Sequence, residues 1–166
     1  YINKIVADLQ DYSRPLNPEY CDINLSDLVE NIFKTIPLPE NIKVAVNIKG
    51  FIQLQTDPLF IRRVITNLVN NAVQAMPNGG LLQINGFQKE NIIHITVSDT
   101  GIGIPDEVKP KLFTPMMTTK SKGQGLGLAV VKRLIEALDG SITFNSEVDR
   151  GTTFTILLPK HPLPKH

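Results

Sequence analysis

The residues with the strongest chemical character follow an alternating apolar segment. Residues 92–98 read IIHITVS, so apolar side chains share one face of an expected strand, and Asp99 continues the same parity. A carboxylate delivered to the edge of a core needs a hydrogen-bond donor, because burying an unpaired charge is costly. The amino group of a flat, apolar ring such as adenine would supply that donor. In the sequence TGIGIP that follows, Gly101 and Gly103 would remove side chains where the ring approaches the backbone, although a plain Asp-Gly turn is the alternative.

A second group of polar residues lies on an expected helix. In the segment NLVNNAVQA, Asn67, Asn71 and Gln74 fall at i, i+4 and i+7 and form one polar strip beside an apolar stripe. Asn71 is closest to the buried face, where its side-chain carbonyl suits Mg²⁺, a hard cation that takes oxygen ligands and shares them with phosphates. A solvated polar face is the alternative, and it is the better interpretation of Asn70, which points away.

A glycine-rich segment, GQGLGL at residues 123–128, opens the last expected helix. Backbone N–H groups at the start of a helix can hold an anion, and the helix dipole favours it. The spacing matches neither a Walker loop nor a dinucleotide fingerprint, so this segment alone is weak evidence for phosphate. Residues 112–122, LFTPMMTTKSK, carry two lysines and three threonines without periodicity. That composition suits a mobile lid over phosphates, although a surface loop is the ordinary interpretation.

The order and separation of these segments are more specific than any one of them. The asparagine-rich helix, DTGIGIP, LFTPMMTTK and GQGLGL resemble, in that order, the N, G1, F and G2 boxes of sensor histidine kinases within the GHKL ATPase superfamily. The resemblance covers about Asp22 to Leu158, and KIVADLQDYSRP upstream resembles the end of the second helix of the family's dimerisation and phosphoacceptor domain. It implies binding of ATP and Mg²⁺ and transfer of the γ-phosphoryl group to a histidine on a phosphoacceptor helix.

The resemblance also implies a role for individual residues. Asp99 would accept a hydrogen bond from the adenine amino group, and Asn71 would ligate Mg²⁺ with Asn67 nearby. Phe113 would anchor the start of the lid. The implied catalytic residues are Asn67, Asn71 and Lys120. The implied nucleotide-binding residues border the adenine, begin the lid or follow the phosphates: Asn71, Asp99, Gly101, Gly103, Ile104, Phe113, Thr119, Lys120, Lys122, Gly123, Gln124, Gly125, Leu126 and Gly127.

Two positions depart from the family's patterns. Gln74 stands where many relatives have a basic residue, which puts a phosphate contact from this helix in doubt. Asn67 stands where the hydrolytic branches carry a glutamate that activates water, and without that carboxylate water is a poor nucleophile. His94, mid-strand, and His161 and His166, in a Pro/Lys tail, do not fit an acceptor helix, so we expect the acceptor to lie outside this chain.

Periodicity and end signals predict the elements that must hold these residues. Helices are expected at 25–35 and 126–138, the latter capped by Gly140, and a long helix is delimited by Asp57-Pro58 and Met76-Pro77. Residues 1–12 are expected to be the tail of another helix. Strands are expected at 43–48 and 51–55, joined by a turn at 49–50, and at 81–88, 92–98, 141–146 and 152–158. The sum is an α+β two-layer sandwich, with a mixed, mostly antiparallel sheet and helices on one face, as in the Bergerat fold that the resemblance implies.

Length and composition limit what else the chain can be. Its 166 residues make one ordinary domain, and a net charge of +1 gives no electrostatic reason to expect nucleic acid or an anionic membrane as partner. Cys21 is the only cysteine and no apolar run could cross a bilayer, so we expect a soluble, cytoplasmic fragment, whose parent could still carry a membrane segment. We divide it into the end of the phosphoacceptor helix with a linker (1–18), the catalytic domain (19–160) and a tail (161–166).

Partners and alternatives follow from the same resemblance. The implied partners are ATP, the phosphoacceptor helix of its own or a partner subunit, and a response regulator, with a homodimeric parent. A GHKL ATPase or a serine-directed anti-sigma kinase is the main enzymatic alternative, and Asn67 and the YSRP segment argue against both. A module that senses ATP without transferring phosphate is the alternative from another class, and the sequence does not separate it from a kinase.

Overall fold

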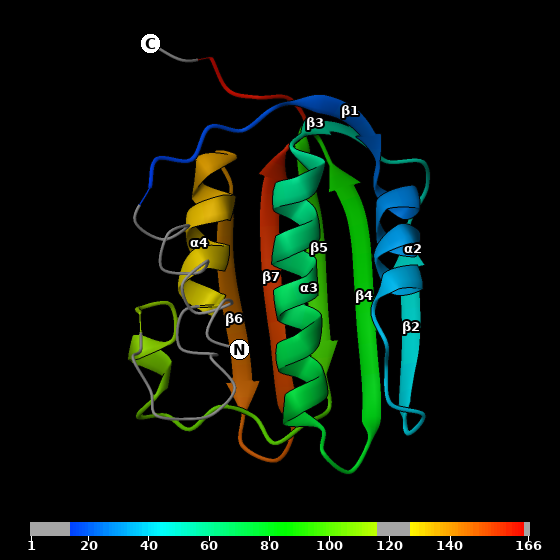
Figure 1. Cartoon of the computed structure of the whole chain (residues 1–166), viewed down its shortest axis with the longest axis vertical. Helices are drawn as coiled ribbons and strands as arrows, with labels where there is room; N and C mark the ends of the chain where they lie inside the picture. Colours follow the sequence, from blue (N-terminus) through cyan, green and yellow to red (C-terminus); the bar gives the residue numbers. More distant parts are fainter. Residues whose placement is uncertain (1–13, 116–126, 165–166) are drawn as a thin grey trace.

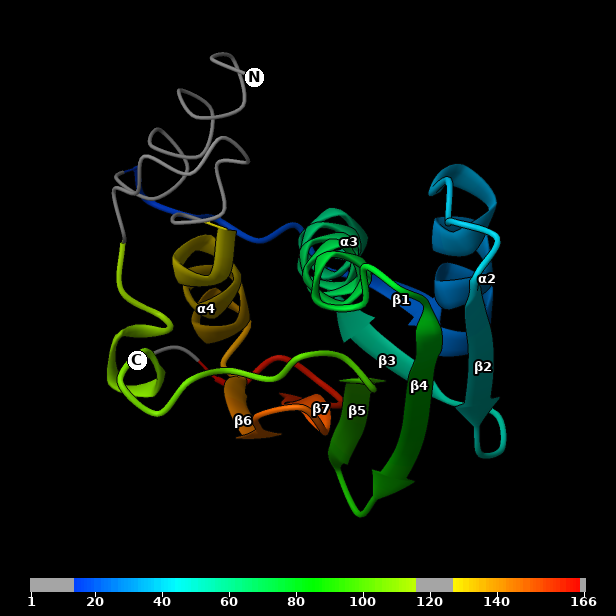
Figure 2. The ribbon, with the colours of Figure 1, turned by 90° about the horizontal axis from the view of Figure 1, so that it is seen from below.

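A five-stranded sheet covered on one face by helices forms the body of the protein (Figures 1 and 2). The computed structural model describes residues 14–115 and 127–164. Within them the elements are β1 (Cys21–Asn24), α2 (Leu25–Thr35), β2 (Ile42–Ile48), β3 (Gln53–Thr56), α3 (Pro58–Ala75), β4 (Gly80–Lys89), β5 (Ile92–Asp99), the short 3₁₀ helix η1 (Lys109–Lys111), α4 (Gly127–Ala137), β6 (Ser141–Glu147) and β7 (Gly151–Pro159).

The sheet has the strand order β2-β4-β5-β7-β6. β2 runs parallel to β4, and the other neighbouring pairs in this sheet are antiparallel. Alternate residues of the central strands, among them Ile84, Ile95 and Ile156, face the helices and are almost fully buried. These features confirm the predicted α+β sandwich with its mixed, mostly antiparallel sheet.

The central helix, α3, lies over the middle of the sheet between α2 and α4 (Figure 1). Its start matches the sequence signals: Asp57 caps it by accepting the backbone N–H groups of Leu59 and Phe60, and Pro58 occupies the first turn. The predicted apolar stripe is buried, at Ile61, Val64, Ile65, Leu68, Val69, Ala72 and Met76. This stripe fixes the rotation of the helix and therefore the direction in which its asparagines point.

One predicted strand pairing is wrong. The segments at 43–48 and 51–55 were expected to form a pair joined at Lys49-Gly50, but β2 pairs with β4 in the large sheet and β3 pairs antiparallel with β1 in a separate two-stranded sheet. Alternation identifies a strand and its faces, but the partner depends on contacts between distant segments. β1 itself, four residues long, was not predicted because it is too short to show a period.

α2 has the predicted bounds, whereas the C-terminal end of α4 differs slightly from expectation. Asn24 caps α2 by accepting the backbone N–H of Asp27. After α4 the residue in the left-handed conformation is Asp139, with φ 61°, rather than Gly140. Gly140 is still favoured, because a Cβ there would meet the carbonyl of Leu157.

The predicted N-terminal helix at 1–12 and most of the predicted lid lie outside the described residues. Among the residues that are described, no helix is both long and apolar enough to span a bilayer.

Candidate nucleotide-binding site

Asp99 is the last residue of β5 and pairs with Leu82 on one side and Thr152 on the other. Its Oδ1 accepts the backbone N–H of Gly101 at 2.8 Å, which fixes the direction of the carboxylate. Burial raises the pKa of Asp99 above its ordinary value, and the N–H groups of Gly101 and Thr152 oppose the rise. The carboxylate is thus held in a partly dehydrated place, where a hydrogen-bond donor from a ligand would offset the cost of burial.

The loop after Asp99 is packed against the end of α3. Ile102 donates its backbone N–H to the carbonyl of Ala75 at 2.9 Å, and a Cβ at Gly101 would overlap the same carbonyl. Ala75 lies one turn beyond Asn71 on α3. This contact therefore sets Asp99 at a fixed distance from the asparagine strip.

The same loop is also held from the side of the β6–β7 turn. Gly103 has φ +76°, and a Cβ there would meet the carbonyl of Glu147. Asp149 donates its N–H to the carbonyl of Ile102 at 2.8 Å. The structure gives both Gly101 and Gly103 a role in close packing of backbone on backbone, so their proximity to an adenine ring stays a prediction.

Ile104 and Phe113 lie on the sheet side of the site. Ile104 packs against the core and donates its N–H to Ser146 Oγ at 2.8 Å. Phe113 makes edge contacts with Phe144 and Phe154, with ring centroids 5.8 and 6.3 Å apart. The aromatic cluster holds the start of the segment that was predicted to be the lid.

Asn67 and Asn71 are half-buried on α3, whereas Asn70 and Gln74 are exposed. Gly127 begins α4, and a Cβ built on it would lie 3.7 Å from Oδ1 of Asn67. A side-chain carbonyl of α3 therefore lies beside the N-terminus of α4, where the helix dipole favours an anion. Three parts of the site therefore follow one another along α3. The N-terminus of α4 lies beside Asn67, Asn71 comes one turn later, and the loop that follows Asp99 contacts the end of the helix.

The oxygen-bearing side chains near the site suit a metal ion that takes most of its ligands from a bound nucleotide and few from the protein. No group of three or more His, Cys, Asp or Glu side chains able to hold a metal occurs among the described residues. Mg²⁺ commonly takes one or two protein oxygens together with phosphate oxygens and water, so the half-buried carbonyl of Asn71 fits this mode of binding. The remaining predicted site residues lie outside the described part of the chain: Thr119, Lys120, Lys122, Gly123, Gln124, Gly125 and Leu126.

Two residues near the site had not been predicted from the sequence. Ser146 Oγ receives the N–H of Ile104 and lies 2.8 Å from Thr152 Oγ1, and Thr152 is one of the few buried polar residues. Their polar side chains face inward from a closing hairpin, and only the register of β7 against β5 brings Thr152 beside Asp99.

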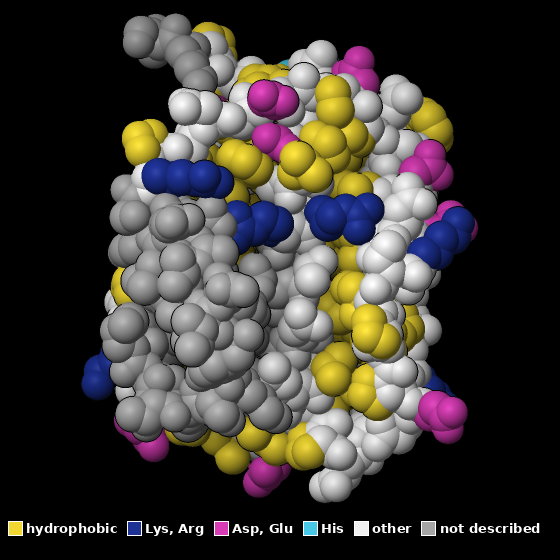
Figure 3. All heavy atoms as spheres, viewed as in Figure 1, with side chains coloured by type: hydrophobic (Ala, Val, Ile, Leu, Met, Phe, Trp, Pro, Cys, Tyr) yellow, Lys and Arg dark blue, Asp and Glu magenta, His cyan; other side chains and the backbone are white. Residues whose placement is uncertain are grey.

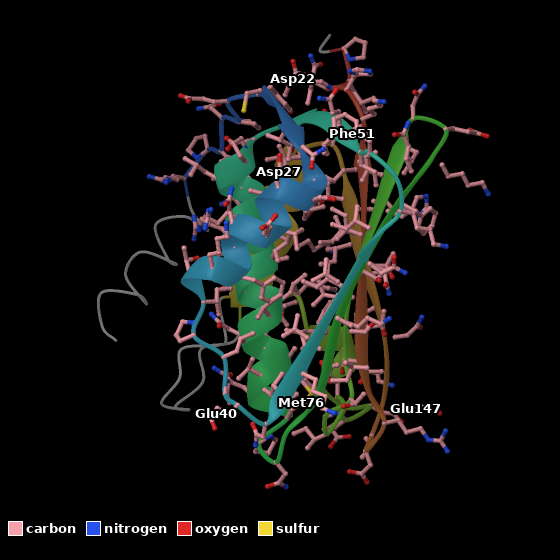
Figure 4. The ribbon with its side chains drawn as sticks, turned by 90° about the vertical axis from the view of Figure 1, so that its right-hand side faces the viewer. Asp22, Asp27, Glu40, Phe51, Met76 and Glu147 are labelled. Carbon is pink, nitrogen blue, oxygen red and sulfur yellow. The ribbon has the colours of Figure 1, made fainter. Side chains whose placement is uncertain are left out.

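An apolar groove lies apart from these residues. A groove of about 630 Å³ lies between α2 and β2, on the side that faces the viewer in Figure 4, and hydrophobic side chains are visible along this side of the helical face in Figure 3. Its lining contains none of the predicted site residues: Ser26, Val29, Glu30, Phe33, Lys34, Leu38, Val44, Val46 and Ile48. We therefore locate the candidate site from the positions of its polar side chains, and not from the position of this groove.

Comparison with known proteins identifies the family of the chain. Residues 56–162 match the family model described as "Histidine kinase-, DNA gyrase B-, and HSP90-like ATPase". The chain is 33% identical to the signal transduction histidine-protein kinase AtoS of Escherichia coli K12 over 169 residues, covering 97% of this chain and 27% of AtoS. It is 36% identical to sporulation kinase D of Bacillus subtilis over 166 residues, covering 95% of this chain and 32% of that protein. The chain thus spans only about a third or less of these relatives.

Solved structures show the same fold. The catalytic domain of the histidine kinase ThkA superposes with a TM-score of 0.77 at 28% identity, covering 87% of this chain and 97% of that domain. The Acinetobacter baumannii histidine kinase AdeS gives a TM-score of 0.81 at 25% identity, covering 96% of this chain and 78% of AdeS. The chain therefore belongs to the histidine kinase-, DNA gyrase B- and HSP90-like ATPase family and is the ATP-binding catalytic domain of a sensor histidine kinase.

Proposed function

We propose that this chain holds ATP with Mg²⁺ and passes the γ-phosphoryl group to a histidine on a phosphoacceptor helix. The observation that carries the proposal is the arrangement along α3 of a half-buried carboxylate at Asp99, a side-chain oxygen at Asn71 and the N-terminus of α4. A nucleotide lying along this helix would meet a base-binding group at one end and phosphate-binding groups at the other.

Each part of the chain then has a distinct task. Asp99 accepts a hydrogen bond from the amino group of adenine, and the packed loop at Gly101 keeps it in position. The backbone N–H groups at the start of α4 face the phosphates, with Asn67 beside them. Asn71 would supply one oxygen to Mg²⁺, which would provide positive charge to offset that of the phosphates.

Two features favour transfer to a partner over hydrolysis. α3 contains no Asp or Glu, so no carboxylate on this helix can act as a general base toward water. The described histidines are also unsuited to accept phosphate within the chain. His94 lies in β5, stacked on Phe87 at 4.5 Å, and His161 lies beside Gln55 in the C-terminal segment, so neither is on a helix.

The proposal extends to domains and partners. Residues 1–18 are assigned to the end of the phosphoacceptor domain and its linker, 19–160 to the catalytic domain and 161–166 to a tail, in a homodimeric parent. The relative ThkA has been solved in complex with a response regulator, TrrA; ThkA is 26% identical to this chain, with a TM-score of 0.81. By extension, a response regulator receives the phosphoryl group from the parent of this chain.

The isolated chain provides a first test. Incubated with labelled ATP and Mg²⁺, it is expected to bind the nucleotide, to remain unlabelled and to hydrolyse ATP only slowly, because the described histidines do not suit an acceptor and α3 carries no base. Equilibrium binding, protein-bound label and released phosphate are measured on the same sample. Rapid hydrolysis that disappears in Asn71→Ala would contradict the proposal and identify an ATPase.

A further inference from the structure

The segment that leads into the domain, residues 14–20, is bound to both site-bearing helices. In Figures 1 and 2 it runs from the side of α4 past the N-terminal end of α3 to β1. Near its start, Arg133 of α4 donates from Nη2 to the carbonyl of Arg14 at 2.9 Å. Leu16 and Tyr20 are partly buried and pack against the core. We refer to residues 14–20 as the strap.

The far end of the strap is held by Asp57, which is only 5% exposed. Its Oδ2 accepts the backbone N–H of Glu19 at 2.9 Å. Its Oδ1 accepts the N–H groups of Leu59 and Phe60 at 2.9 and 3.3 Å. One carboxylate therefore caps α3 and fastens the strap to that cap at the same time. A helix cap needs only one of these two oxygens, so the second contact is additional to the usual capping role.

The surroundings leave the strap little freedom at this point. Directly after it, β1 pairs with β3, and Cys21 lies opposite Thr56, the residue before Asp57. The hydroxyl of Tyr20 is buried without a hydrogen-bond partner among the described residues. Its pKa is raised first by burial and then by the charges of Asp139 and Asp57.

Both attachments therefore join the strap to elements that form the nucleotide site. α3 carries Asn67 and Asn71, and α4 begins at Gly127 beside Asn67. Resting on the proposed function, we propose that Asp57 is a positioning residue: through Glu19 it fixes the direction in which the preceding chain leaves the domain, and so presents a covalently attached acceptor histidine to the phosphoryl donor. Arg133 has the same role at the other end of the strap.

Asp57→Asn separates this role from helix capping. Asn caps helices as well as Asp does, and its carbonyl can keep the bonds to Leu59 and Phe60. The amide NH₂ then faces the N–H of Glu19, and two donors cannot bond. Asp22→Asn is the matched control, because it removes the same charge from an exposed position on the neighbouring β1, visible in Figure 4.

The test compares phosphoryl transfer in two arrangements. In the intact parent protein the acceptor domain is joined through the strap; in the second arrangement this chain and a separate acceptor domain are mixed. Asp57→Asn is expected to slow labelling of the joined acceptor by about tenfold to a hundredfold, as misplacement of a reacting group does, and to leave labelling of the separate acceptor and the affinity for ADP unchanged. Arg133→Ala is expected to give the same pattern, and Asp22→Asn to change neither rate.

The outcomes separate this proposal from the proposed function. Equal losses in the two arrangements would mean that Asp57 only stabilises the fold, and an unchanged rate in the joined protein would overturn the positioning role. Hydrogen exchange at the amide of Glu19 is expected to be faster in Asp57→Asn than in Asp22→Asn. Equal exchange rates would contradict the claim that Asp57 holds the strap through Glu19. If the unsubstituted protein labels neither acceptor, the proposed function fails and the positioning role fails with it, whatever the exchange result.

Discussion

Asp99→Asn should remove most of the affinity for ADP while leaving the protein folded. In the substituted chain the amide NH₂ replaces the oxygen that accepts from adenine, so a donor faces a donor. Hydrogen bonds to charged groups are worth about 1.5–3 kcal/mol, which corresponds to a loss of about tenfold to a hundredfold in affinity. Calorimetric titration of both proteins with ADP measures the effect directly. GDP, whose base carries a carbonyl in place of the amino group, is expected not to bind the unsubstituted chain measurably, because that carbonyl would face the carboxylate of Asp99.

The stability of the same variant provides an independent check. Because the pKa of Asp99 is raised in the folded chain, the folded state binds more protons than the unfolded state as pH passes upward from the ordinary carboxyl value of 3.8 to the folded value. The free energy of unfolding therefore falls through that range, and the loss is complete above the folded pKa. The side chain of Asn does not titrate, so at neutral pH Asp99→Asn should be at least as stable as the unsubstituted chain. The difference between their free energies of unfolding should become smaller at acidic pH. Equal ADP and GDP affinities, or a variant that loses ADP binding only because it unfolds, would contradict the assignment.

Asn71→Ala should have the largest effect on phosphoryl transfer. If Asn71 supplies an oxygen to Mg²⁺, its removal should abolish most of the dependence of ATP binding on Mg²⁺. Loss of one preorganised electrostatic group in a site costs about a hundredfold to a thousandfold in rate, and a similar loss is expected here. The measurements are ATP affinity with and without Mg²⁺ and the rate of labelling of an acceptor domain.

Asn70→Ala is the matched control for that experiment. Asn70 is the adjacent residue on α3 and is exposed, whereas Asn71 is half-buried. The control should bind ATP and Mg²⁺ normally and change the free energy of unfolding by no more than about 0.5 kcal/mol, as exposed substitutions usually do. Equivalent effects of the two substitutions would mean that the polar strip does not face the nucleotide.

The helices could be predicted closely because their signals are local. α2 has the predicted bounds, Leu25–Thr35, and α3 begins after Asp57 as its cap and proline indicate. Strand pairing is different in kind. β2 was recognised as a strand, but its parallel partner β4 comes 38 residues later in register, at Ile42 and Gly80, and nothing in either segment specifies the other. The pairing of β2 with β3 was predicted wrongly because the sequence carries no local signal for the true partner of β2.

The site could be predicted in part for the same reason. The parity of β5 placed Asp99 at the edge of the core, and the stripe of α3 directed Asn71 to the half-buried side. The packing of Gly101 on Ala75 could not be predicted, because it joins segments that meet only in the fold. The second role of Asp57 was missed likewise: its cap is local, but the partner of its other oxygen, Glu19, is 38 residues away.

The most direct test of the central claim is transfer from this chain to a separate acceptor. The chain is mixed with the complete dimerisation and phosphoacceptor domain of its parent, labelled ATP and Mg²⁺, and the protein-bound label is followed with time and then exposed to acid and to base. The account predicts that label accumulates on the acceptor domain alone and that it is lost in acid and stable in base, as phosphohistidine is. When Asn71→Ala replaces the unsubstituted chain, label should accumulate about a hundredfold to a thousandfold more slowly. ATP binding without any labelling of the acceptor domain would contradict the account and leave a nucleotide-sensing module as the better description.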